Sequence, residues 1–128
     1  MSEPYAVKNL DQIAHTKWPR WAPIRHEFDI RAFGINSWRH EEGSDVIPEH
    51  VEESGHEELY LVLEGHATFT IDGNEVDAPK GTAVFIRDPS LKRKAVARDP
   101  DTNVLSIGGW PDKPFAVSGW ETEYMQET

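Results

Sequence analysis

The sequence predicts an all-β domain folded as a sandwich or a barrel. Three observations support this prediction: the apolar segments are short and alternate with the period of a strand, turn-forming residues separate them, and one segment alone has a helical pattern. The chain has 128 residues, enough for one compact domain with a hydrophobic core. We therefore expect a single domain, residues 1–128, with an N-terminal arm (1–30), a barrel core (31–109) and a C-terminal tail (110–128).

The N-terminal arm contains the helix-like segment, residues 9–16. Asn9 is well placed to cap it, because an Asn side chain accepts hydrogen bonds from the free backbone N–H groups of a first helical turn. The next segment, 17–25, carries two tryptophans and two prolines, and we expect it to pack across a face of the barrel. We expect the same of the C-terminal tail, which carries Trp110 and Trp120.

The barrel core is expected to consist of short strands rich in β-branched and aromatic residues. The strand-like segments are residues 31–38, 59–63, 67–71, 82–86, 94–97 and 103–109. Asp72-Gly73 predicts a hairpin turn. Segments rich in proline, glycine and aspartate predict the other turns, at 78–81, 87–90 and 98–103.

The composition excludes several classes of function. The chain has 13 basic and 23 acidic residues, a formal charge of −10, whereas nucleic acids and anionic membranes bind positive faces. No apolar run approaches the ~20 residues that cross a bilayer, and the first residues lack the pattern of a signal peptide. There is no cysteine, hence no disulfide, thiolate metal site or cysteine nucleophile. We expect a cytoplasmic protein without nucleic-acid or membrane partners.

Two motifs with a short spacing lie in the second third of the chain. A pattern G-x5-H-x-H-x(3,4)-E-x6-G is partly matched by Gly43, His50, Glu52, Glu58 and Gly65. A second pattern, G-x5-P-x-G-x2-H-x3-N, aligns from Gly81 to Lys92. These motifs, over residues 43–97, resemble the cupin family, and the spacing between them resembles that of small bacterial cupins. The resemblance implies a jelly-roll barrel with a short N-terminal helix or arm.

The chain departs from the cupin motifs at two of their three histidines. The second histidine is replaced by Glu52, and the third by Lys92, or by Arg93 if the register shifts by one residue. His56 is an extra histidine in a lengthened loop between Glu52 and Glu58, and it could substitute for one that is missing.

The segment around Glu58 is expected to present two different faces, because side chains of a strand alternate with period two. His56, Glu58 and Tyr60 share one face. The motif glutamate of a cupin points into the barrel, so the resemblance implies that these three side chains line the cavity, with His50 and Glu52 opposite.

The first interpretation of these residues is a metal-dependent enzyme of the cupin dioxygenase, isomerase or cyclase type. Two imidazoles and two carboxylates can bind Zn, Fe, Mn or Ni. The expected ligands are His50, Glu52, His56 and Glu58. Tyr60, or Glu58 if its carboxylate is free, is the candidate acid–base group acting on a small molecule.

The second interpretation is a metal-free cupin that binds a small molecule or serves a structural role. A cation at the third-histidine position repels a metal, and Lys92 or Arg93 could instead neutralise Glu52 or Glu58. Either cation could also bind an anionic substrate, Arg93 bidentately. Trp38 could extend the wall of the cavity and contact the ligand.

The other face of the same segment carries Leu59, Leu61 and Leu63, a row too apolar to face water. Either segment 17–25 or a second subunit must cover this row. The resemblance to small cupins implies a homodimer.

Overall fold

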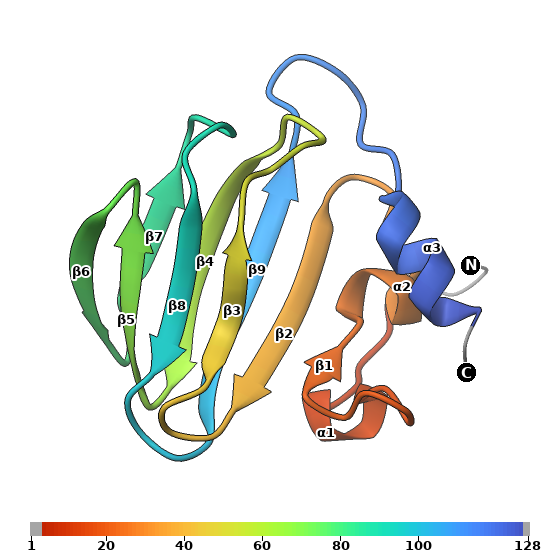
Figure 1. Ribbon diagram of the computed structural model, residues 1–128. Coiled ribbons are helices and arrows are strands. Elements are labelled where there is room, and N and C mark those ends of the chain that lie inside the picture. The colour runs from red at the N-terminus through yellow and green to blue at the C-terminus, as the bar shows by residue number, and fades with distance from the viewer. Residues whose placement is uncertain (1–3, 127–128) are drawn as a thin grey trace.

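A computed structural model describes residues 4–126 (Figure 1). It contains two antiparallel β-sheets that face each other. The larger sheet has the strand order β1-β2-β9-β4-β7, and the smaller sheet has the order β3-β8-β5-β6. Short helices gather beside β2, at the side of the barrel where the described chain also begins and ends.

The strands are β1 (Trp21–Ala22), β2 (Gly34–His40), β3 (Asp45–His50), β4 (Glu57–Glu64), β5 (His66–Ile71), β6 (Asn74–Pro79), β7 (Ala83–Ile86), β8 (Arg93–Ala97) and β9 (Thr102–Gly109). The helices are α1 (Leu10–Ile13), α2 (Ile24–Phe28) and α3 (Gly119–Met125). This arrangement confirms the predicted all-β fold.

Asn9 caps α1 as the sequence predicts. Its side chain accepts a hydrogen bond from the amide of Asp11 at 2.9 Å, and Gln12 accepts one from the amide of Asn9 at 2.8 Å. The helix is shorter than predicted, because the chain turns away at Ala14 and the amide of His15 bonds to the carbonyl of Trp21 at 2.8 Å.

The prediction of a single helix is wrong, since α2 and α3 are helical as well. Pro23 stands at the N-cap of α2, where its missing N–H and fixed φ are tolerated. Asp29 ends α2 in the left-handed conformation, with φ of 52°. Neither helix has the length that makes a helical period visible in the sequence.

The two longer strands that the sequence analysis missed, β3 and β6, are the edges of the smaller sheet. Both contain charged residues and a proline, Pro48 in β3 and Pro79 in β6. Edge strands tolerate proline and charge because one side of their backbone needs no ladder partner. The prolines and charged residues obscure the alternating apolar pattern in the sequence, but they do not prevent strand formation at an edge.

The hydrophobic core lies between the two sheets. Its fully buried members are Val46, Val62, Ala67, Phe69, Ala78, Ala95, Ala97 and Val104, and Tyr60 is 1% exposed. Tyr60 and Phe69 pack across the interface with ring centroids 5.4 Å apart. Tyr60 and Ile47 belong to this core and also line the cavity described below.

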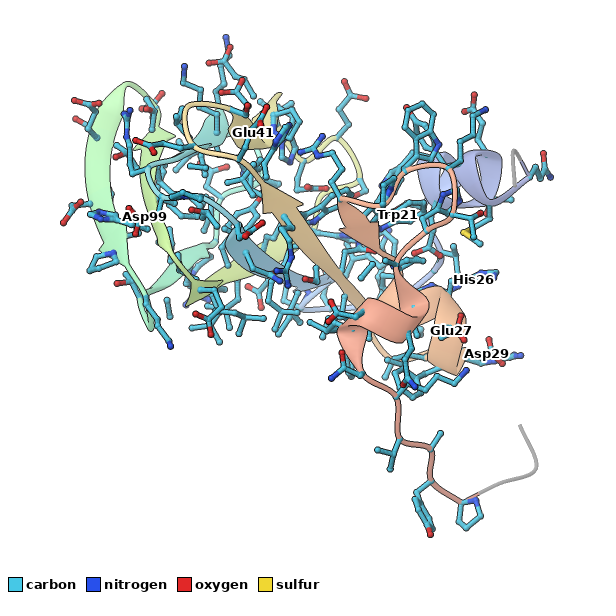
Figure 2. The ribbon with its side chains drawn as sticks, turned by 90° about the horizontal axis from the view of Figure 1, so that it is seen from below. Trp21, His26, Glu27, Asp29, Glu41 and Asp99 are labelled. Carbon is cyan, nitrogen blue, oxygen red and sulfur yellow. The ribbon has the colours of Figure 1, made fainter. Side chains whose placement is uncertain are left out.

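The N-terminal arm packs beside β2, where Figure 2 labels Trp21, His26 and Glu27, and part of it covers the outer face of the larger sheet. Ile13, Ala22 and Ile24 form a second apolar cluster there. Ile35 of β2 and Leu105 of β9 pack against it. None of the helices in residues 4–126 has the length and apolarity needed to cross a membrane.

The predicted apolar row on β4 continues across its neighbours. The cross-strand pairs are Leu59 with Ile107 and Phe85, and Leu61 with Leu105 and Ala83. The arm reaches this face at Leu105, whereas Phe85 is 47% exposed. Segment 17–25 and its neighbours therefore cover the β2–β9 side of the face and leave the β7 side open.

Candidate functional site

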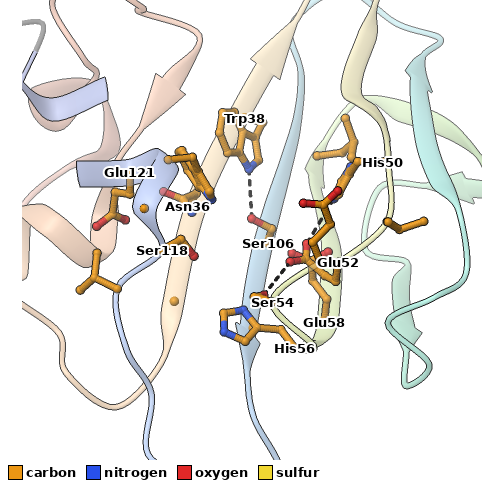
Figure 3. Close-up of a pocket in the computed structure, with 18 of the residues that line it drawn as sticks. Asn36, Trp38, His50, Glu52, Ser54, His56, Glu58, Ser106, Ser118 and Glu121 are labelled. Carbon is orange, nitrogen blue, oxygen red and sulfur yellow. Dashed lines mark hydrogen bonds and ion pairs between the residues drawn. The ribbon is translucent and has the colours of Figure 1, made fainter. Parts of the chain in front are cut away.

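A large cavity opens at one end of the barrel, with a volume of about 1030 Å³ (Figure 3). Strands β2, β3, β4 and β9 and the C-terminal segment that leads into α3 form its walls. Asn36 and Trp38 on β2 lie on one side of the cavity, and His50, Glu52 and Glu58 lie on the other.

His50, Glu52 and Glu58 form a compact cluster in the cavity wall. His50 ends β3, Glu52 follows in the next loop, and Glu58 lies near the start of β4. One ligand atom from each of the three side chains lies within 4.8 Å of the others, and all three residues are half-buried. The structure thus brings together three of the four metal ligands that the sequence predicts.

His50 is held in a defined orientation. Its Nδ1 lies 2.7 Å from the carbonyl oxygen of Pro48, which can only accept, so Nδ1 donates. Its Nε2 lies 3.2 Å from Oε2 of Glu52, and this hydrogen bond raises the pKa of His50. An unprotonated Nε2 and the carboxylate of Glu52 are both hydrogen-bond acceptors and repel each other. Their close approach therefore requires a proton or a cation between them.

Glu52 and Glu58 differ in their electrostatics. Burial works against the charge of Glu52, but the hydrogen bond and charge of His50 outweigh it and lower the pKa of Glu52. Burial, followed by the charge of Glu52, raises the pKa of Glu58 to about 7, despite opposing effects of Tyr60, His50 and Arg93. Glu58 can therefore hold or release a proton near neutral pH.

Oε1 of Glu58 accepts hydrogen bonds from two buried side chains. The hydroxyl of Tyr60 donates to it, and Nη1 of Arg93 donates to it at 3.3 Å. Burial raises the pKa of Tyr60 well above its ordinary value, so the phenol stays protonated. Oε2 of Glu58 belongs to neither contact and is the oxygen available to a ligand.

Arg93, rather than Lys92, occupies the position behind Glu58. Arg93 is fully buried, whereas Lys92 is exposed. Besides Glu58, the Arg93 guanidinium donates to loop carbonyls: those of Leu91 at 2.9 and 3.1 Å, of Asp88 at 3.3 Å and of Pro89 at 3.4 Å. Its contacts therefore fasten this loop to Glu58.

His56 lines the same cavity but lies outside the three-residue cluster. It precedes β4 and packs against two rings of the C-terminal segment, Trp110 with centroids 4.1 Å apart and Phe115 at 5.6 Å. Burial lowers its pKa and favours the neutral imidazole.

Trp38 forms part of the opposite wall. Its indole Nε1 donates to Oγ of Ser106 at 3.0 Å, and its ring stacks on Trp21 with centroids 6.0 Å apart and an interplanar angle of 11°. Trp120 of α3 packs against it at 6.0 Å. The structure places Trp38 where the sequence predicts a ligand-facing side chain.

The C-terminal segment contributes cavity residues that the sequence analysis did not assign to the site: Trp110, Phe115, Trp120, Glu121 and Tyr124. Trp110 donates from Nε1 to the carbonyl of Ser54 at 2.7 Å, and Glu121 forms a buried ion pair with Arg25 at 2.6 Å. The concentration of aromatic residues in the tail beyond the last strand was the sequence feature that could have indicated this wall of the cavity.

Comparisons with known proteins agree with this architecture. The family model described as the cupin domain matches residues 37–89. A cupin protein from Bacteroides fragilis superimposes with a TM-score of 0.70 at 20% identity, over 91% of this chain and 92% of that one. No curated protein matches the sequence.

Two further solved structures share the barrel. KdgF from Halomonas sp. has a TM-score of 0.59 at 17% identity, over 70% of this chain and 74% of that one. A predicted oxalate decarboxylase from Thermotoga maritima has a TM-score of 0.55 at 22% identity, over 66% and 71%. These likenesses show the jelly-roll fold, and the cupin family model matches the part of the chain from β2 to the loop after β7.

Proposed function

We propose that this cupin-fold protein binds a divalent transition metal through His50, Glu52 and Glu58 and binds a small molecule beside it. One observation carries the proposal: ligand atoms of these three side chains, from two strands and a loop, lie within 4.8 Å of one another in the wall of a large cavity.

The chemistry of the donor set fits a metal. A metal-binding histidine typically donates its other ring N–H to a carbonyl or carboxylate, which fixes the ring and its tautomer. The contact of His50 Nδ1 with the carbonyl of Pro48 at 2.7 Å has this form and leaves Nε2 as a ligand. One imidazole and two carboxylates suit Mn, Fe, Zn or Ni, and the two oxygen ligands favour Mn among these.

A metal held by three protein ligands would retain open positions and supply Lewis-acid chemistry to a bound oxygen atom. The side chains of this chain would supply proton transfer. With Glu58 bound to the metal, we propose the protonated Tyr60, which donates a hydrogen bond to Glu58 at the cavity wall, as the proton-transferring group. Without a metal, the carboxyl of Glu58, with a pKa of about 7, would take this role.

The second candidate function is small-molecule binding without a metal. Two contacts favour it: Nε2 of His50 lies 3.2 Å from Glu52, and Nη1 of Arg93 lies 3.3 Å from Glu58. With His50 protonated, each carboxylate of the cluster has its own counter-charge. Under this alternative the cluster is a polar network that shapes the cavity.

Titration calorimetry of the chelator-treated chain without a His tag distinguishes the two functions. We expect one Mn²⁺ or Zn²⁺ per chain, with affinity about 100-fold weaker in His50→Ala, since the loss of a ligand costs at least as much as the loss of its supporting contact. His66→Ala is the control, because His66 pairs with Asp77 on the surface. Equal metal affinity in wild type and His50→Ala, or no binding by either, contradicts the metal site.

We further infer that the chain forms a homodimer through the outer face of β4 and β7. An apolar row of the half-buried Ile107 and Leu59 and the exposed Phe85 runs across three strands, and the N-terminal arm ends short of its β7 side. Sedimentation equilibrium is expected to give a dimer for wild type and a monomer for Phe85→Glu, which places a charge on this face. A wild-type monomer, or an unchanged dimer in Phe85→Glu, contradicts this inference.

A further inference from the structure

We propose that His56 and the C-terminal segment, residues 110–121, form a second recognition element for an uncharged ligand. The ligand class is a compound with an aromatic or other apolar body and a hydroxyl or carbonyl group that hydrogen-bonds to the His56 imidazole. The proposal rests on the proposed function in one respect, namely that the cavity binds a small molecule.

The first observation is a buried nitrogen without a partner. His56 is 6% exposed, and its Nε2 has no hydrogen-bond partner among the residues that the structure describes. A buried polar atom left unpaired costs about 1–3 kcal/mol. His56 lines the cavity, but its Nε2 is itself covered, so a ligand oxygen would supply the missing hydrogen bond after a small shift of the neighbouring rings.

The second observation is that the imidazole is held in place by its surroundings. Trp110 packs edge-on against the ring, and Phe115 lies on another side. Gly108 of β9 lies beside the ring, where a Cβ would be in ordinary van der Waals contact with Nδ1 of His56 at 3.7 Å. Fixed placement of a polar group among apolar walls is the usual construction of a specific small-molecule site.

The C-terminal segment is itself fixed at both ends. Trp110 donates to the carbonyl of Ser54 at 2.7 Å, which ties the segment to the loop before β4. Arg25 and Glu121, both buried, form the ion pair of 2.6 Å that anchors the start of α3. The wall between these anchors carries the aromatic surface against which a ligand body can pack.

The charges around the cavity favour an uncharged ligand. Three carboxylates of the lining are already engaged: Glu52 by His50, Glu58 by Arg93, and Glu121 by Arg25. The other two, Glu49 and Glu53, are exposed to solvent. Arg20, a cation of the lining, donates from Nη2 to the carbonyls of Asp45 and Val46 at 3.2 and 3.4 Å, whereas its Nε has no hydrogen-bond partner among the described residues. An anionic ligand would also enter a chain with a formal charge of −10.

The test uses three probes that share one ring and differ in charge: benzyl alcohol, benzoate and benzylammonium. Chelator-treated protein labelled with ¹⁵N at histidine is titrated with each probe, and the His56 Nε2 resonance is followed by NMR. We expect benzyl alcohol to shift this resonance and to bind at least tenfold more tightly than either ion. Tighter binding of an ion, or an unchanged Nε2 resonance, overturns the proposal.

Variants separate the hydrogen bond from the shape of the site. His56→Phe keeps a ring but removes the nitrogens, and we expect about tenfold weaker binding of benzyl alcohol, whereas His56→Gln restores part of it. His66→Phe, a surface control, should bind as wild type does. Unchanged binding of benzyl alcohol by His56→Phe overturns the proposal. If that variant does not fold, the shift of the His56 Nε2 resonance in wild type is the test.

The experiment is independent of the metal. The probes are titrated into metal-free protein, so failure of the metal site leaves these results intact. If wild type binds the metal but none of the probes, the inference about His56 fails while the proposed metal site stands.

Discussion

Replacing Arg93 with methionine is expected to lower the free energy of unfolding by about 3–5 kcal/mol, the usual cost of removing one partner of a buried ion pair. Arg93 is fully buried, and its guanidinium bonds to Glu58 and to the carbonyls of Asp88, Pro89 and Leu91. Methionine fills similar volume but donates no hydrogen bond. Urea unfolding followed by tryptophan fluorescence measures the effect.

Lys92→Met is the matched control, because Lys92 is the adjacent residue and is exposed. Surface changes of this kind usually stay within about 0.5 kcal/mol. The double variant Glu58→Gln, Arg93→Met should recover part of the loss, because it removes the carboxyl group that Arg93→Met leaves without its cation. Equal stabilities of Arg93→Met and Lys92→Met would show that the buried contacts of Arg93 do not hold the loop.

The second large effect is expected at the other buried pair. Glu121→Ala leaves the guanidinium of Arg25 buried without its counter-ion, and we expect a loss of about 3 kcal/mol together with release of α3 from the barrel. Release would free Trp120, already 40% exposed, from its packing at 5.5 Å from Trp21 and shift its fluorescence further to longer wavelength. The amide hydrogens of α3 should exchange faster in Glu121→Ala than in wild type, whereas those of β4 and β9 should keep their rates.

Glu123→Ala is the control within the same helix, since Glu123 is exposed. Release of α3 would also alter the cavity, because the C-terminal segment forms one of its walls. A Glu121→Ala chain in which α3 keeps wild-type exchange rates would mean that the aromatic contacts of Trp120 and Tyr124 suffice to dock the helix.

The sequence predicts the central strands well because their residues satisfy one condition, alternation between core and surface. Tyr60 and Val62 point into the core, and Leu59 and Leu61 point outward. Edge strands obey weaker conditions, so Pro48 and the charges around it hide β3. Helices α2 and α3 depend on packing against distant residues, such as Arg25 against Glu121, which no local pattern reveals.

The sequence alone could have shown which of Lys92 and Arg93 points into the barrel. Ala95 and Ala97 are the small buried residues of β8, and alternation places Arg93 on the same face. The position of His56 was not answerable in this way. Strand β4 begins at Glu57, so the period-two argument does not extend to His56, and contacts with Trp110 and Phe115 place its ring.

The direct test of the metal site is anomalous diffraction from crystals grown with Mn²⁺. We predict one strong peak per chain, coordinated by Nε2 of His50 and by carboxylate oxygens of Glu52 and Glu58, with His56 outside coordination distance. The absence of a peak at this cluster, or a peak coordinated by His56 in place of His50, would contradict the account.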